Sequence, residues 1–119
     1  KPFEEDFPNT AKAFVQSIFG ENADSNLVKT ISNDMSSAPP EVALASFRSL
    51  FEFKEAPIFD EVNIPVRFIN SKRFPTNSEA AKKHIKNFEL KIIDGVGHFP
   101  MLENREEFNK VLEKHPGMR

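Results

Sequence analysis

The sequence predicts an α/β fold in which a helical segment precedes a strand, helix, strand and helix. Two observations predict this class. Apolar residues recur at helical spacing through the first half of the 119-residue chain, and after about residue 63 short apolar runs alternate with amphipathic segments. Strands that alternate with helices pair in parallel through a right-handed crossover. We therefore divide the chain into a helical segment, residues 1–56, and an α/β segment, residues 57–119.

Three helices are expected in the first segment. They span about Thr10–Phe19, Ser25–Met35 and Pro40–Phe51. Gly20 is expected to end the first helix, and the side chain of Asp24 or Ser25 to cap the second. The polar opening Lys1–Pro8 contains two prolines and no initial methionine, which predicts that the chain is a piece of a longer protein.

Two strands are expected in the second segment, over Ile64–Asn70 and Phe88–Ile93. Between them, Thr76 and Glu79 have the spacing of a capping box and predict the start of a helix. A final helix should carry Phe108, Val111 and Leu112 on one face.

Composition excludes several classes of function. The 16 basic and 18 acidic side chains are mixed along the chain and give a net charge of -2, so we expect neither nucleic-acid nor membrane binding. Cysteine is absent and the three histidines are scattered, so no metal and no cofactor is expected. No apolar run approaches the length of a membrane span, and we expect a cytoplasmic protein.

The aromatic residues are all phenylalanine, 13 in number, and seven of them lie between Phe3 and Phe53. They have two interpretations. They form the core of the helical segment, or they belong to a helical cap that closes an apolar pocket, because small-molecule sites are concave and mostly apolar.

His98 is the strongest candidate for chemistry. It follows an apolar run and two glycines, Gly95 and Gly97, which allow a tight turn at the end of a strand. Imidazole can take and return a proton near neutral pH, and ligands of parallel sheets sit at the carboxyl ends of the strands. The alternative is a structural or merely exposed histidine. A phosphate-binding loop at Gly95–Gly97 is disfavoured because a third glycine and a following lysine are missing.

The stretch Asp94–Glu103, followed by Glu106–Leu112, resembles the C-terminal histidine segment of the α/β-hydrolase family. Asn63–Ile69 resembles the penultimate core strand of that family, and the three earlier helices resemble its lid. The resemblance implies a partial α/β-hydrolase fold made of a helical lid and the C-terminal part of the core. It also implies that His98 is the general base of a hydrolase acting on a small apolar ester or related carbonyl substrate.

Two departures from that family stand out. No G-x-S-x-G nucleophile motif is present, so this chain alone is expected to be inactive. Lys72 and Arg73 stand where the acid that orients the histidine is expected, either as a solvated charge pair or as a functional change. Asp94 is a weaker candidate for that acid. A non-catalytic small-molecule-binding or regulatory protein therefore remains the alternative.

Three further expectations concern the surface. His84 and His115 are interpreted as surface groups, because one lies in a helix and the other beside a proline near the end of the chain. Two strands alone leave sheet edges exposed, so the chain is expected to be able to self-associate through them.

Overall fold

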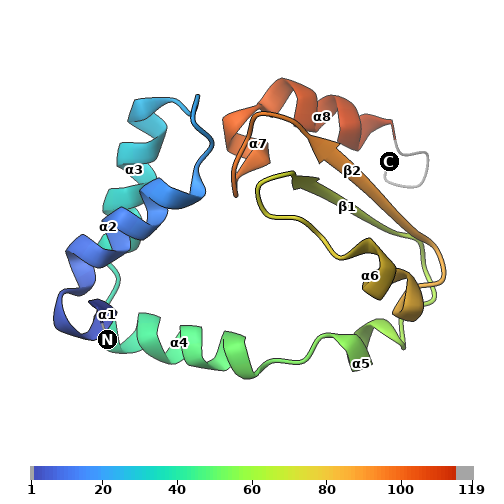
Figure 1. Ribbon diagram of the computed structural model, residues 1–119, viewed down its shortest axis with the longest axis horizontal. Coiled ribbons are helices and arrows are strands. Elements are labelled where there is room, and N and C mark those ends of the chain that lie inside the picture. Colours follow the sequence, from blue (N-terminus) through green and yellow to red (C-terminus); the bar gives the residue numbers. More distant parts are fainter. Residues whose placement is uncertain (1, 115–119) are drawn as a thin grey trace. The chain divides into compact units, whose positions relative to one another are not determined.

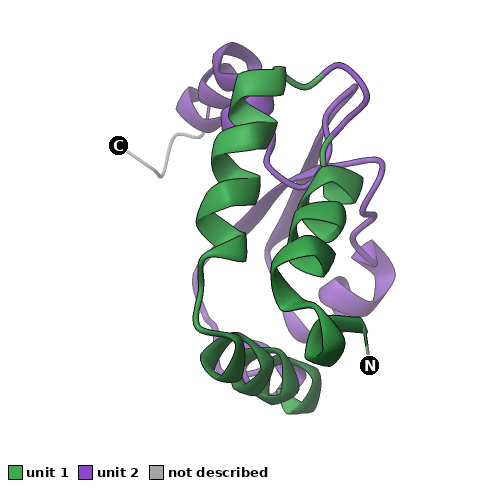
Figure 2. Cartoon of the chain, turned by 90° about the vertical axis from the view of Figure 1, so that its left-hand side faces the viewer, with its two compact units in different colours: residues 1–19, 23–53 green, residues 20–22, 54–119 purple. Residues whose placement is uncertain are grey.

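The fold is known from a computed structural model that describes residues 2–114 (Figure 1). His115, interpreted above as a surface group, lies outside the described residues. The chain divides into two compact units, residues 1–19 with 23–53 and residues 20–22 with 54–119 (Figure 2). The stretch Gly20–Asn22, which the sequence assigns to the helical segment, thus belongs to the second unit.

The first unit is entirely helical over its described residues. It contains α1 (Pro2–Glu5), α2 (Phe7–Ile18), α3 (Ser25–Ser36) and α4 (Pro40–Glu52). Helix α2 begins three residues earlier than predicted, because the side chain of Asp6 accepts a hydrogen bond from the backbone N–H of Asn9 and caps the helix. Pro8 stands in the first turn, where a missing N–H costs nothing. The prolines of the opening stretch therefore start helices rather than interrupt them.

Helix α2 supplies the buried face of this unit. Phe7, Ala11, Val15 and Ile18 recur at helical spacing and are all buried. Helix α3 packs along α2 and is capped by Asp24, whose carboxylate accepts hydrogen bonds from two backbone N–H groups. The prediction that Asp24 or Ser25 caps this helix is thus resolved in favour of Asp24.

The second unit contains the sheet. Its elements are α5 (Ala56–Phe59), β1 (Val66–Ser71), α6 (Ser78–His84), β2 (Phe88–Ile93), α7 (Pro100–Glu103) and α8 (Arg105–Glu113). Strands β1 and β2 pair in parallel, with Val66 opposite Phe88 and Ser71 opposite Ile93. The two arrows point the same way in Figure 1. The predicted α/β class with a parallel strand pair is confirmed. Helix α5 falls where no element was predicted.

Two local predictions in this unit are wrong. Asn77, not Thr76, caps α6, because its side chain accepts from the N–H of Ala80. The predicted final helix is divided by Asn104, which ends α7 and caps α8 by accepting from the N–H of Glu107. Both caps are asparagines, which favour the non-helical backbone of a cap.

Ile85, Ile93 and Val96 are buried apolar residues of the second unit. Ile93 ends β2 and Val96 lies three residues later, so the core reaches to the carboxyl ends of the strands. No helix within residues 2–114 is both long enough and apolar enough to cross a membrane.

Candidate functional site

His98 lies in the loop between β2 and α7, beyond the carboxyl end of the strand, and its side chain is exposed. The loop turns at Gly95, whose φ of 74° lies in the left-handed region that favours glycine. The imidazole stands edge-on to two phenyl rings, with centroids 5.7 Å from Phe74 and 5.0 Å from Phe99. The two rings limit the positions that the exposed imidazole can take.

The carboxylate of Glu103 holds this loop in place. Its Oε1 accepts hydrogen bonds from the backbone N–H of Gly20 at 2.7 Å and of Gly97 at 3.0 Å. Its Oε2 accepts from Gly97 at 3.0 Å and from Phe99 at 3.1 Å. Charged acceptors make the stronger class of hydrogen bonds, and these fix the backbone on both sides of His98. The sequence showed Glu103 only as part of the resemblance, and its role appears only in the fold.

Gly20 completes this arrangement from a distant part of the chain. A Cβ built on Gly20 would lie 2.9 Å from the carbonyl oxygen of Gly95 and 3.0 Å from Oε1 of Glu103. No other residue type fits there without moving backbone, so Gly20 is required for close approach rather than for ending a helix. Helix α2 in fact ends at Ile18, with Phe19 as its C-cap.

A second set of hydrogen bonds holds the loop after β1. The side-chain amide nitrogen of Asn70 donates to the carbonyl oxygen of Phe74 at 2.6 Å and to Oγ1 of Thr76 at 2.7 Å. Its Oδ1 accepts from the N–H of Ser71 at 2.8 Å. Asn70 thereby folds the loop so that Phe74 reaches His98, a role that the sequence did not indicate.

The position expected to hold the orienting acid is occupied by an ion pair. Nζ of Lys72 lies 2.8 Å from Oδ1 of Asp94, and both side chains are about three-quarters exposed. The register explains the pair, because Ser71 and Ile93 are opposite each other and the next residues of both strands are therefore neighbours. Within residues 2–114 no carboxylate forms a hydrogen bond with the ring of His98. Lys72 is thus a solvated charge that is also paired with Asp94.

His84, predicted to be a surface group, is half-exposed and has a partner of its own. Its Nδ1 lies 2.7 Å from Oδ1 of Asp60, which links α6 to the end of α5. Among the described residues there is no group of three or more side chains that could hold a metal ion.

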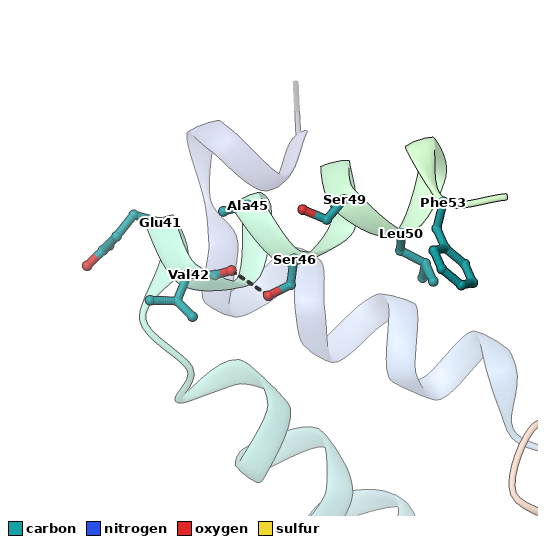
Figure 3. A pocket seen from close by; sticks show the side chains of 7 residues that line it. All are labelled: Glu41, Val42, Ala45, Ser46, Ser49, Leu50 and Phe53. Atoms are coloured by element: carbon teal, nitrogen blue, oxygen red, sulfur yellow. Dashed lines mark hydrogen bonds between the residues drawn. The ribbon is translucent and has the colours of Figure 1, made fainter. Parts of the chain in front are cut away.

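The first unit contains an apolar cavity of about 280 Å³. Phe3, Phe7, Phe14 and Phe47 line it, and the rings of Phe3 and Phe47 are 5.7 Å apart. A groove follows α4, where Val42, Leu50 and Phe53 are exposed (Figure 3). The phenylalanines of this unit thus differ in their exposure to solvent, since Phe19 is buried whereas Phe51 is 86% exposed.

Comparison with known proteins gives matches to solved structures. No protein-family model and no curated protein sequence matches the chain. Est816, described as an N-acyl homoserine lactone degrading enzyme, is 18% identical with a TM-score of 0.74, over 93% of this chain and 48% of its own. The 2-hydroxy-6-oxo-6-phenylhexa-2,4-dienoate hydrolase BphD from Rhodococcus sp. strain RHA1 is 22% identical with a TM-score of 0.69, over 95% of this chain and 46% of its own.

The chain therefore spans about half the length of the solved structures that it matches. Both matches have the α/β-hydrolase fold, and both extend over nearly all of this chain. The chain has the fold of the C-terminal portion of an α/β-hydrolase.

Proposed function

We propose that this chain is the C-terminal part of a hydrolase in which His98 is the general base. The observation that carries the proposal is the loop after β2, where Glu103 fixes the backbone on both sides of an exposed imidazole. In an α/β-hydrolase fold this position suits a histidine that takes a proton from a nucleophile and delivers it to a leaving group. Residues 1–56 act as the lid in this proposal.

The remaining catalytic parts come from outside this sequence. A nucleophile on a G-x-S-x-G elbow and the donors of an oxyanion hole are required for acyl transfer, and neither motif is present in residues 1–119. The chain alone is accordingly inactive in this proposal. The acid that orients His98 is also supplied from elsewhere, because Asp94 is engaged by Lys72.

The proposed substrate is a small apolar ester or related carbonyl compound. A lid rich in phenylalanine favours apolar groups, and its cavity is lined mainly by apolar side chains. The printed names of the two structural neighbours denote a lactone-degrading enzyme and a hydrolase of an oxo acid, both of which act on carbonyl compounds.

The test compares His98→Ala with His84→Ala in a polypeptide that joins this chain to a nucleophile-bearing half. Hydrolysis of short-chain p-nitrophenyl esters should fall about 10³-fold with His98→Ala, since general-base catalysis contributes at this scale. His84→Ala, a control at the other described histidine, should keep the parent rate. Residues 1–119 alone should not exceed the buffer rate. Equal rates for the parent and the His98→Ala variant would remove His98 from the mechanism.

A second candidate is a non-catalytic small-molecule-binding or regulatory protein of the same fold. The ion pair between Lys72 and Asp94 favours it, because a cation at this position cannot stabilise an imidazolium. Titration of the same polypeptide with a short-chain alkyl ester separates the two. Calorimetric binding without turnover, unchanged by His98→Ala, would favour the binding protein.

A further inference from the structure

Strand β2 has one edge with no neighbouring strand. Within residues 2–114 the sheet consists of β1 and β2 alone. The N–H of Val66 donates to the carbonyl oxygen of Asn87 at 2.8 Å, and in a parallel ladder such contacts fall on every second residue. The N–H and C=O groups of Phe88, Leu90 and Ile92 therefore point to the opposite, unpaired edge. Such an edge is a template for another strand.

The sequence of β2 is complementary to that of a second β2 strand that runs antiparallel to it. From Phe88 to Ile92 the order is apolar, acidic, apolar, basic, apolar. If a second copy runs antiparallel with the two-fold axis at Leu90, Glu89 of each copy lies directly opposite Lys91 of the other. Phe88 lies opposite Ile92, a pair of an aromatic and a β-branched residue. Opposite charges and such apolar pairs both stabilise antiparallel strands.

The backbone geometry agrees with this register. With the axis at Leu90, the residues that face each other with free N–H and C=O groups are the apolar ones, Phe88, Leu90 and Ile92. Glu89 and Lys91 then form the non-hydrogen-bonded pairs, in which side chains come closest. Ile92 is 40% exposed in the single chain and would be covered by Phe88 of the second copy.

We propose that two copies of this chain associate through the free edge of β2, antiparallel about Leu90, to form a continuous four-stranded sheet. The ion pairs within each copy are compatible with this arrangement. Glu89 lies 3.0 Å from Arg67 on β1 and 3.2 Å from Lys91, all on one face. In the dimer Glu89 stands between Arg67 of its own chain and Lys91 of the other.

Strand β1 does not offer the same complementarity. The groups on its free edge belong to Arg67, Ile69 and Ser71, and an axis at Ile69 would place Arg67 opposite Ser71. Phe68 would then face Asn70. Neither pair combines opposite charges or two apolar side chains, so charge complementarity selects β2.

The first test is the association constant of the full chain, measured by sedimentation equilibrium. The parent should show a monomer–dimer equilibrium based on a monomer mass of 13.6 kDa. In Lys91→Glu, the new carboxylate at position 91 of each copy lies opposite Glu89 of the other copy. This repulsion should raise the dimer dissociation constant at least about tenfold. Lys29→Glu on the exposed surface of α3 makes the same change in net charge and should leave the constant unchanged. A parent that stays monomeric, or a dimer unaffected by Lys91→Glu, would overturn the proposal.

The second test reads the register directly and does not depend on charge. The chain has no cysteine, so a single introduced thiol can bridge only to its copy. Leu90→Cys lies on the proposed axis and should form an intermolecular disulfide under mild oxidation. Ile92→Cys would face Phe88 rather than itself and should cross-link far less, because its Cα–Cα separation exceeds the ~7 Å limit for a disulfide. Equal cross-linking of the two variants would refute the register.

Discussion

Replacement of Glu103 should destabilise the chain more than any exposed charge change. In Glu103→Ala three backbone N–H groups lose their acceptor, and one of them, that of Gly97, belongs to a buried residue. An unpaired buried donor costs about 1–3 kcal/mol, and the two half-buried donors add less, because water can reach them. We expect a loss of about 3 kcal/mol. Glu103→Gln keeps one acceptor oxygen and should lose roughly half as much.

The free energy of unfolding is measured by urea denaturation followed by circular dichroism. Glu106→Ala is the matched control, because Glu106 is exposed at the start of α8 and pairs with the likewise exposed Lys110 of the same helix. Its midpoint should stay close to that of the parent. If Glu103→Ala and Glu106→Ala unfold at the same urea concentration, the carboxylate does not hold the loop and the reasoning fails.

Further predictions concern four single positions. Gly20→Ala should destabilise the chain by about 1–3 kcal/mol, since its Cβ would press on the carbonyl of Gly95. Gly95→Ala should destabilise it by about 1 kcal/mol, because the φ of Gly95 is positive. The midpoints of thermal unfolding of the two variants test this order. Ser71→Ala should be neutral or stabilising by about 1 kcal/mol, because the buried Oγ of Ser71 has no hydrogen-bond partner, and a clear loss of stability would show a partner. The hydrogen bond with Lys110, followed by its charge, lowers the pKa of Glu106 from 4.5. That contribution is small, is present above pH 4.5 and is lost as the pH falls through the lowered pKa. The small gap between parent and Glu106→Gln in urea titrations should therefore narrow as the pH is lowered below 4.5.

Much of the fold could be predicted because each element carries its own periodic pattern. The strands at Val66–Ser71 and Phe88–Ile93 contain apolar runs bounded by turn residues, and the helices have apolar faces at regular spacing. The ends of the helices were less predictable. Asn77 and Thr76 are both good caps, and only the fold shows that Thr76 is used by Asn70 instead.

The position of the candidate site could be predicted, but its supports could not. His98 follows a strand and two glycines, which is a local signal. Glu103 acts on Gly20, 83 residues away in the sequence, and no periodicity reports such a contact. The partner of Lys72 could not be predicted either, because the pairing of Lys72 with Asp94 depends on the register of the two strands.

The path of the chain between the units limits how the protein can be divided. The second unit takes residues 20–22 from within the helical unit, so the chain passes from one unit to the other three times. A contiguous fragment beginning at Lys54 would contain Glu103, Gly97 and Phe99 but not Gly20. The histidine loop is thus held partly by a residue that a cut at Lys54 removes, and the helical unit cannot be exchanged between homologous proteins as one piece without carrying or rebuilding that contact.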